Sequence, residues 1–97
     1  MSGGDWKDMF YAVQRGDLEL VNFHLRTGIN INYQHPEFGT TPLIESIRKG
    51  HLAIARLLLE NGADPKAKED YGGETALLVA EAKKNQEAIR LIQQYLV

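Results

Sequence analysis

Side chains that could serve as nucleophiles, bases or metal ligands are few and widely separated in this chain of 97 residues. No two of the three histidines have metal-ligand spacing, and no His-Glu-x-x-His stretch occurs. Ser46 has no nucleophile elbow around it, and Ser2 is terminal. The absence of cysteines excludes disulfides, thiolate chemistry and cysteine metal sites. The sequence therefore predicts no enzyme, no cofactor, no metal and no small-molecule substrate.

Charge and composition narrow the class of partner. The net charge is −2, from 11 basic and 13 acidic residues, and the basic residues are scattered. Nucleic-acid binding needs a clustered basic face, so we expect no nucleic-acid partner. The N-terminus has neither a basic nor an apolar signal region, and no apolar run approaches the ~18 residues of a membrane span. With 43% hydrophobic and 25% charged residues, we expect a soluble, cytoplasmic protein without membrane contact.

An internal repeat organises the chain. An offset of 34 residues aligns it with itself without a gap. The aligned residues include Gly16 with Gly50, Gly28 with Gly62, Leu25 with Leu59, Thr41 with Thr75, and Leu43 with Leu77. Three such copies predict a stacked array that forms one domain over residues 1–97, with units at about 3–35, 36–69 and 70–97.

Each unit is predicted to contain two short helices. In the central copy, Thr41 is a natural N-cap and Pro42 a natural first helical residue, and Gly50 suits a left-handed helix end. The expected helices span about 5–14, 18–27, 42–49, 52–61, 76–84 and 86–96. Two loops, which we call the first finger (29–40) and the second finger (63–74), connect the units. The predicted fold is all-α, with three helix-turn-helix units joined by short hairpin loops.

The motifs of the central copy are similar to those of a known family. Gly39-Thr40-Thr41-Pro42-Leu43, Gly50-His51-Leu52 and the stretch 57–64 resemble the ankyrin-repeat consensus, and the outer copies match it less closely. The resemblance implies an ankyrin-repeat solenoid whose first helices and fingers line a concave, protein-binding face. The usual histidine after the Thr-Pro-Leu motif is replaced by Phe10, Ile44 and Leu78, where we expect apolar packing instead.

Several single residues have alternative interpretations. We expect His51 to have a structural role in the ankyrin turn, and His24 to be either a packing residue or a pH-sensitive one. Ser46 occupies a place where a small residue is expected between touching helices. Trp6 is predicted to cover the open N-terminal edge of the stack; otherwise it is an exposed anchor or part of a dimer contact.

Aromatic and charged residues on the fingers and first helices form the predicted partner surface, because such residues often anchor interfaces. For Phe38 and Tyr71 the alternative is that they pack finger against finger, and for His35 that it is a solvated tip. Glu45 either faces a basic partner or is exposed and idle. The full set comprises Arg15, Tyr33, His35, Glu37, Phe38, Thr40, Glu45, Arg48, Lys49, Tyr71, Glu74 and Lys83.

These observations predict a non-catalytic protein–protein interaction module, which acts as a scaffold, adaptor or stoichiometric regulator. The alternative is a structural protein that self-associates through terminal apolar residues, namely Trp6, Leu96 and Val97. We expect a monomer or a weak homodimer.

Overall fold

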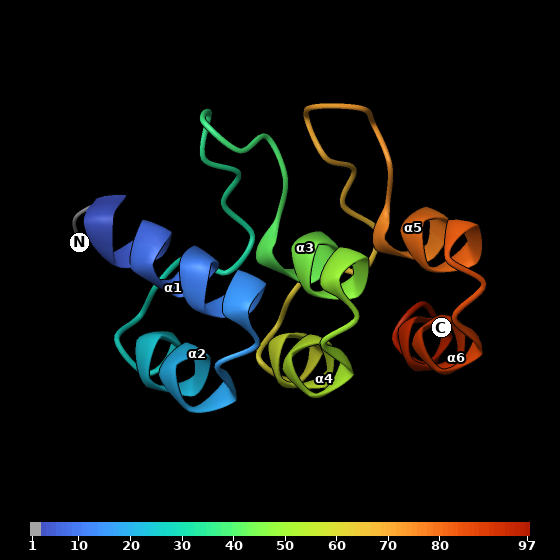
Figure 1. Cartoon of the computed structure of the whole chain (residues 1–97), viewed down its shortest axis with the longest axis horizontal. Coiled ribbons are helices and arrows are strands. Elements are labelled where there is room, and N and C mark those ends of the chain that lie inside the picture. Colours follow the sequence, from blue (N-terminus) through green and yellow to red (C-terminus); the bar gives the residue numbers. More distant parts are fainter. Residues whose placement is uncertain (1–2) are drawn as a thin grey trace.

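The computed structural model of the protein describes residues 3–97, which form six α-helices in three antiparallel pairs (Figure 1). Ser2, noted above as terminal, lies outside the described residues. The helices are α1 (Gly3–Arg15), α2 (Leu18–Leu25), α3 (Pro42–Lys49), α4 (Leu52–Glu60), α5 (Ala76–Ala82) and α6 (Gln86–Gln94).

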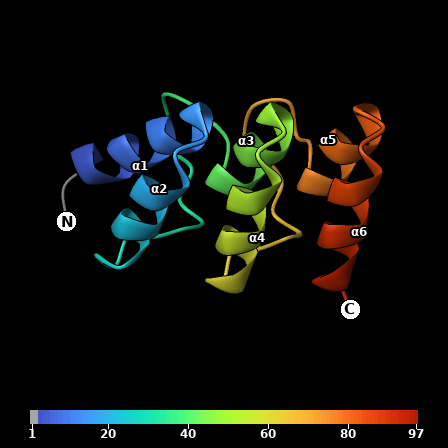
Figure 2. The same cartoon turned by 60° about the horizontal axis from the view of Figure 1, so that its bottom comes forward.

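The helices lie in two layers. Helices α1, α3 and α5 form one layer, α2, α4 and α6 form the other, and both fingers project from the side of the first layer (Figure 1). The turned view in Figure 2 shows the three pairs side by side in chain order. Consecutive first helices contact each other more extensively than α2 contacts α4. The all-α, three-unit architecture predicted from the repeat is confirmed, whereas the exact unit boundaries stay a prediction.

Local sequence signals account for the helix ends. The side chains of Thr41 and Thr75 accept hydrogen bonds from the N–H groups of Ile44 and Leu78, which caps α3 and α5. Gly50 ends α3 in the left-handed conformation, with φ of 79°. The observed helices differ from the expected ranges by two residues or fewer at each end, within the usual uncertainty of frayed last turns.

One continuous apolar core runs through the three pairs. Ala12, Ser46 and Ala80 occupy equivalent places in the units and are all fully buried, as expected where first and second helices meet. Ser46 fits there because its hydroxyl donates to the carbonyl of Leu43 at 2.7 Å. Helices of this length are marginal alone, so the burial between neighbouring pairs is what stabilises them.

Amide side chains join the two fingers. The Gln34 amide donates to the carbonyl of Lys68 and accepts from the N–H of Asp70, each at 2.8 Å. In the same way, Asn32 donates to the carbonyl of Gly62 at 3.3 Å and accepts from the N–H of Asp64 at 2.8 Å. Each first-finger amide therefore forms two hydrogen bonds with the backbone of the second finger or, at Gly62, of the residue just before it.

The first finger is also fixed to α1 by aromatic packing. Trp6 is only 3% exposed, stacks on Phe10 at 5.0 Å and on His35 at 5.8 Å, and meets the edge of Tyr33. Trp6 therefore lies beneath the first finger, and its interpretation as an exposed anchor is wrong. Stacking of Phe10 on Phe38 at 4.6 Å confirms the expected apolar packing at this place.

Leu78, which occupies in the third unit the place of Phe10 in the first, differs in its burial. Ile44 in the central unit is buried, but Leu78 is 48% exposed, because no described helix pair packs beyond α5 and α6. The expectation of apolar packing at Leu78 is therefore wrong, and a large apolar side chain faces solvent at this end of the stack.

Candidate protein-binding groove

A groove lies where the two fingers meet α1 and α3. Its volume is about 350 Å³, and we call it the finger groove. It unites residues that are far apart in the sequence: Phe10, Gln14, Glu37, Phe38, Thr40, Glu45, Arg48, Glu69 and Tyr71. Six of the twelve predicted partner residues therefore line one groove, and Glu74 borders it through its approach to Arg48.

Arg48 is the centre of the polar network in this groove. Its Nη2 donates to both carboxylate oxygens of Glu69 at 3.0 Å, and its Nη1 donates to Glu45 Oε1 at 3.2 Å. Glu74 Oε1 lies farther away, at 3.9 Å. Partial burial opposes the charge of the guanidinium, but the hydrogen bonds and charges of Glu69 and then Glu45 outweigh it and raise the pKa of Arg48 above its ordinary value.

Two predicted contact residues are buried. Glu45 is 6% exposed, and its second oxygen accepts from the Gln14 amide at 3.1 Å, so the interpretation of Glu45 as an exposed, idle acid is wrong, whereas its role towards a basic partner stays a prediction. Its burial is tolerated because Arg48 and Gln14 satisfy the carboxylate. Thr40 is 3% exposed and so is not presented on the finger surface as predicted. Its Oγ1 has no hydrogen-bond partner among the described residues.

The aromatic residues divide between packing and exposure. Phe38 is half-buried, stacks on Phe10 and forms a T-shaped pair with Tyr11, so it packs against α1 and not against the other finger as the alternative had it. Tyr71 donates its hydroxyl to the carbonyl of Pro36 and thereby ties the second finger to the first. Tyr71 as a whole residue nevertheless remains 58% exposed. Tyr33 is also exposed, and its ring forms a T-shaped pair with Trp6.

The other polar residues of the first finger take part in its structure. Glu37 is exposed and forms an ion pair with Lys7 at 3.1 Å. His35 is half-buried on Trp6, and its Nδ1 accepts the N–H of Glu37 at 3.1 Å. His35 is therefore a folded part of the finger, and the solvated-tip interpretation is wrong.

Three predicted cations lie outside the groove lining. Arg15, Lys49 and Lys83 are exposed at equivalent places, where α1, α3 and α5 end. None has an ion-pair partner within the described residues. A cation at a helix C-terminus complements the helix dipole, so these three residues have a structural explanation that needs no partner.

Glu69 lies in the second finger but was not included in the predicted set of partner contacts. It lies 21 residues from Arg48, in a finger whose loop sequence carries no periodic signal. Only the folding of the second finger over α3 brings the two together. His24 and His51 agree with their structural interpretations: His24 is 9% exposed, and the ring of His51 bonds the carbonyl of Gln14 at 3.2 Å.

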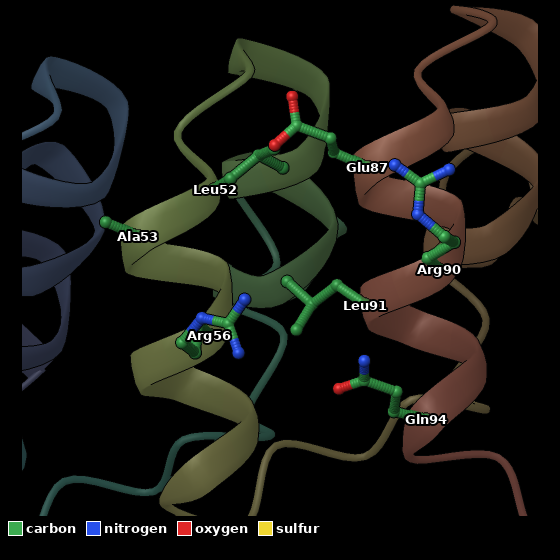
Figure 3. A pocket seen from close by; sticks show the side chains of 7 residues that line it. All are labelled: Leu52, Ala53, Arg56, Glu87, Arg90, Leu91 and Gln94. Carbon is green, nitrogen blue, oxygen red and sulfur yellow. The ribbon is translucent and has the colours of Figure 1, made fainter.

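Two further grooves lie between the second helices. The one between α4 and α6, with a volume of about 330 Å³, has Leu52 and Leu91 among its lining residues and carries Arg56, Glu87, Arg90 and Gln94 (Figure 3). The view shows Leu91 pointing from α6 towards α4. The other, between α2 and α4, has a volume of about 400 Å³. Neither contains a residue of the predicted partner surface.

Residues 3–97 contain neither a group of possible metal ligands nor a helix that could span a membrane. No three His, Asp or Glu side chains there are grouped so that they could hold a metal ion. None of the helices described is both long and apolar enough for a membrane span.

Comparison with known proteins gives a consistent result. The family model described as "Ankyrin repeats (3 copies)" matches residues 9–95. The chain is 39% identical over 69 residues to the human 2-5A-dependent ribonuclease, covering 71% of this chain and 9% of that protein. It is 34% identical over 93 residues to Protein HOS4 of Saccharomyces cerevisiae, covering 92% of this chain and 8% of that protein.

A third relative is the human ARF GTPase-activating protein GIT1, which is 36% identical over 88 residues, covering 90% of this chain and 11% of that protein. The chain thus spans about a tenth of the length of these relatives. The two-layer stack of helix pairs, the projecting fingers and the family match together show that the chain belongs to the ankyrin-repeat family.

Proposed function

We propose that this chain binds a protein partner at the finger groove and acts as a cytoplasmic scaffold, adaptor or stoichiometric regulator. The observation that carries the proposal is the groove itself, in which an exposed tyrosine and an arginine lie on a surface built from both fingers and two first helices. Tyrosine and arginine are enriched among the residues that dominate interface energies. Ankyrin repeats serve as interaction modules, and a groove open to solvent suits a partner segment better than an enclosed substrate.

The test is capture of partners from cells followed by titration of purified proteins. We expect Tyr71→Ala to weaken binding at least about tenfold, since truncation of an anchor residue commonly costs more than about 1.4 kcal/mol. Phe23→Ala is the matched control, because Phe23 is an equally exposed aromatic residue (57%) on α2, in the other layer. Equal effects of the two variants, or an effect of Phe23→Ala alone, would contradict a partner at the finger groove.

Self-association is a second candidate, favoured by exposed apolar residues in the two end units. Phe23 lies in the first helix pair and Leu78 in the third. Pairing of such ends between chains would cover both side chains. Light scattering at increasing protein concentration tests this: a dimer that Leu78→Lys converts to a monomer would support it. A monomer at high micromolar concentration would contradict it.

A further inference from the structure

We propose that the partner inserts a lysine or arginine side chain into the finger groove, so that the ligand is a basic protein segment. This inference rests on the proposed function and adds the chemistry of the partner. It starts from the charges around Arg48: the carboxylates of Glu45, Glu69 and Glu74 surround a single guanidinium. Glu37, at the rim of the groove, is already paired with Lys7.

The net charge of the groove determines whether a positively or a negatively charged partner segment is favoured. Three carboxylates and one guanidinium leave an excess of two negative charges in the groove. Both terminal nitrogens of Arg48 already donate to Glu69 and Glu45, so the charge of the guanidinium is offset before an anion arrives. An acidic segment would meet like charges, which disfavours association, whereas a cation would be attracted.

Glu74 is the carboxylate that remains available. Its oxygen is 3.9 Å from Arg48 Nη2, beyond hydrogen-bonding distance, and its side chain is 47% exposed. Glu45 and Glu69 are almost fully buried and already hydrogen-bonded. An incoming ammonium or guanidinium group would therefore pair first with Glu74 and would be held by the field of the two buried acids behind it.

Two further features suit a cationic donor. Thr40 lines the groove and is nine-tenths or more buried, yet its hydroxyl has no partner among the residues described. A buried hydroxyl without a partner is unusual and costly, and the N–H group of an incoming side chain is one that this oxygen can accept from. Tyr71 adds an exposed ring on the same groove, over which a lysine or arginine can make a cation–π contact.

The experiment uses the intact chain and a displayed library of short random peptides. We expect bound peptides to be enriched in lysine and arginine over aspartate and glutamate, and their affinity to fall with added salt. For a selected peptide, Glu74→Gln should weaken binding about tenfold. Glu60→Gln, which removes an exposed carboxylate from α4, should leave the affinity unchanged. Thr40→Val, with the carboxylates intact, should weaken binding severalfold.

Acidic or charge-neutral peptides, or a library without basic binders, would overturn the inference. So would unchanged affinity in Glu74→Gln. The Tyr71→Ala and Phe23→Ala pair separates this failure from that of the proposed function. If Tyr71→Ala weakens binding and Glu74→Gln does not, the groove binds a partner that is not basic. If only Phe23→Ala weakens binding, both proposals fail.

Discussion

At the scale of single residues, Arg48 holds two buried acids in place. A carboxylate taken out of water is costly unless it is paired and hydrogen-bonded. Arg48 Nη2 donates to both carboxylate oxygens of Glu69, and Arg48 Nη1 donates to Glu45. The fork shape of the guanidinium allows one side chain to reach both acids.

Removal of this guanidinium should therefore destabilise the fold. We expect Arg48→Ala to lower the free energy of unfolding by about 2–3 kcal/mol, less than for a fully buried pair because Arg48 is a third exposed. Arg48→Lys keeps the charge but lacks the fork, so its loss should be smaller, about 1 kcal/mol. Urea unfolding of the two variants measures the difference. Equal losses would mean that charge alone, without the fork, supports Glu45 and Glu69.

The direction of the Arg48 pKa also makes a prediction about pH. A cation whose pKa is raised in the folded state contributes stability that is complete below its unfolded pKa and is lost only as pH rises through the folded value. Both values lie in strongly alkaline solution. The difference in unfolding free energy between wild type and Arg48→Met should thus stay constant from neutral to mildly alkaline pH. A difference that shrinks over this range would contradict the assignment.

Neighbouring threonines provide a matched pair of tests. Thr41 caps α3 through its hydroxyl, whereas the hydroxyl of Thr40 has no described partner. We expect Thr41→Val to cost about 1–2 kcal/mol, and Thr40→Val to be neutral or stabilising in the free chain because it removes an unsatisfied buried group. Thermal unfolding followed by circular dichroism compares them. A large loss in Thr40→Val would show that its hydroxyl is satisfied within the fold.

At the scale of elements, the first finger depends on one glycine. Gly39 has φ of 61°, and a Cβ there would overlap the ring of Tyr71. Gly28 also has a positive φ, of 83°, but a Cβ there would meet nothing. A side chain at Gly28 would therefore cause backbone strain alone, whereas a side chain at Gly39 would cause backbone strain and a steric clash with the second finger.

Alanine substitutions at these two glycines should lower the free energy of unfolding by different amounts. We expect Gly28→Ala to cost about 1 kcal/mol from backbone strain alone, and Gly39→Ala to cost about 1–3 kcal/mol more from the overlap with Tyr71. In a Tyr71→Ala background, Gly39→Ala should no longer cause most of this additional loss of unfolding free energy. A double-mutant cycle measures the difference. If the additional loss persists in that background, the overlap is not the cause.

Helix positions were predictable from local sequence, and finger contacts were not. Thr41 and Pro42 act at the first turn of α3 and Gly50 acts at its last turn, so the sequence alone indicates where α3 begins and ends. The pairing of Arg48 with Glu69 and the burial of Trp6 beneath His35 depend on how loops fold over distant helices. No spacing rule encodes such contacts, and for this reason Glu45 and Thr40 were expected at the surface.

At the scale of the whole molecule, stability is shared between neighbouring helix pairs. In such an array each unit contacts only the adjacent ones, so the central pair carries both interfaces. Leu58 on α4 is fully buried within the continuous core. Damage at this residue should therefore affect all three units together.

We expect Leu58→Ala to lower the free energy of unfolding by about 2–5 kcal/mol, a large part of the total for a domain of this size. Leu18→Ala is the control, since Leu18 is well exposed. Chemical denaturation followed by circular dichroism and by the fluorescence of Trp6 tests both points. A loss below half a kilocalorie per mole would mean that the core does not depend on this residue.

The amide side chains of Asn32 and Gln34 have a consequence for the kinetics of association. They fasten the two fingers to each other before any ligand arrives. The surface that a partner contacts is therefore already ordered, and the fingers lose little conformational entropy when the complex forms. Encounter should resemble rigid docking, with a single rate that grows in proportion to ligand concentration and no slower rearrangement after contact.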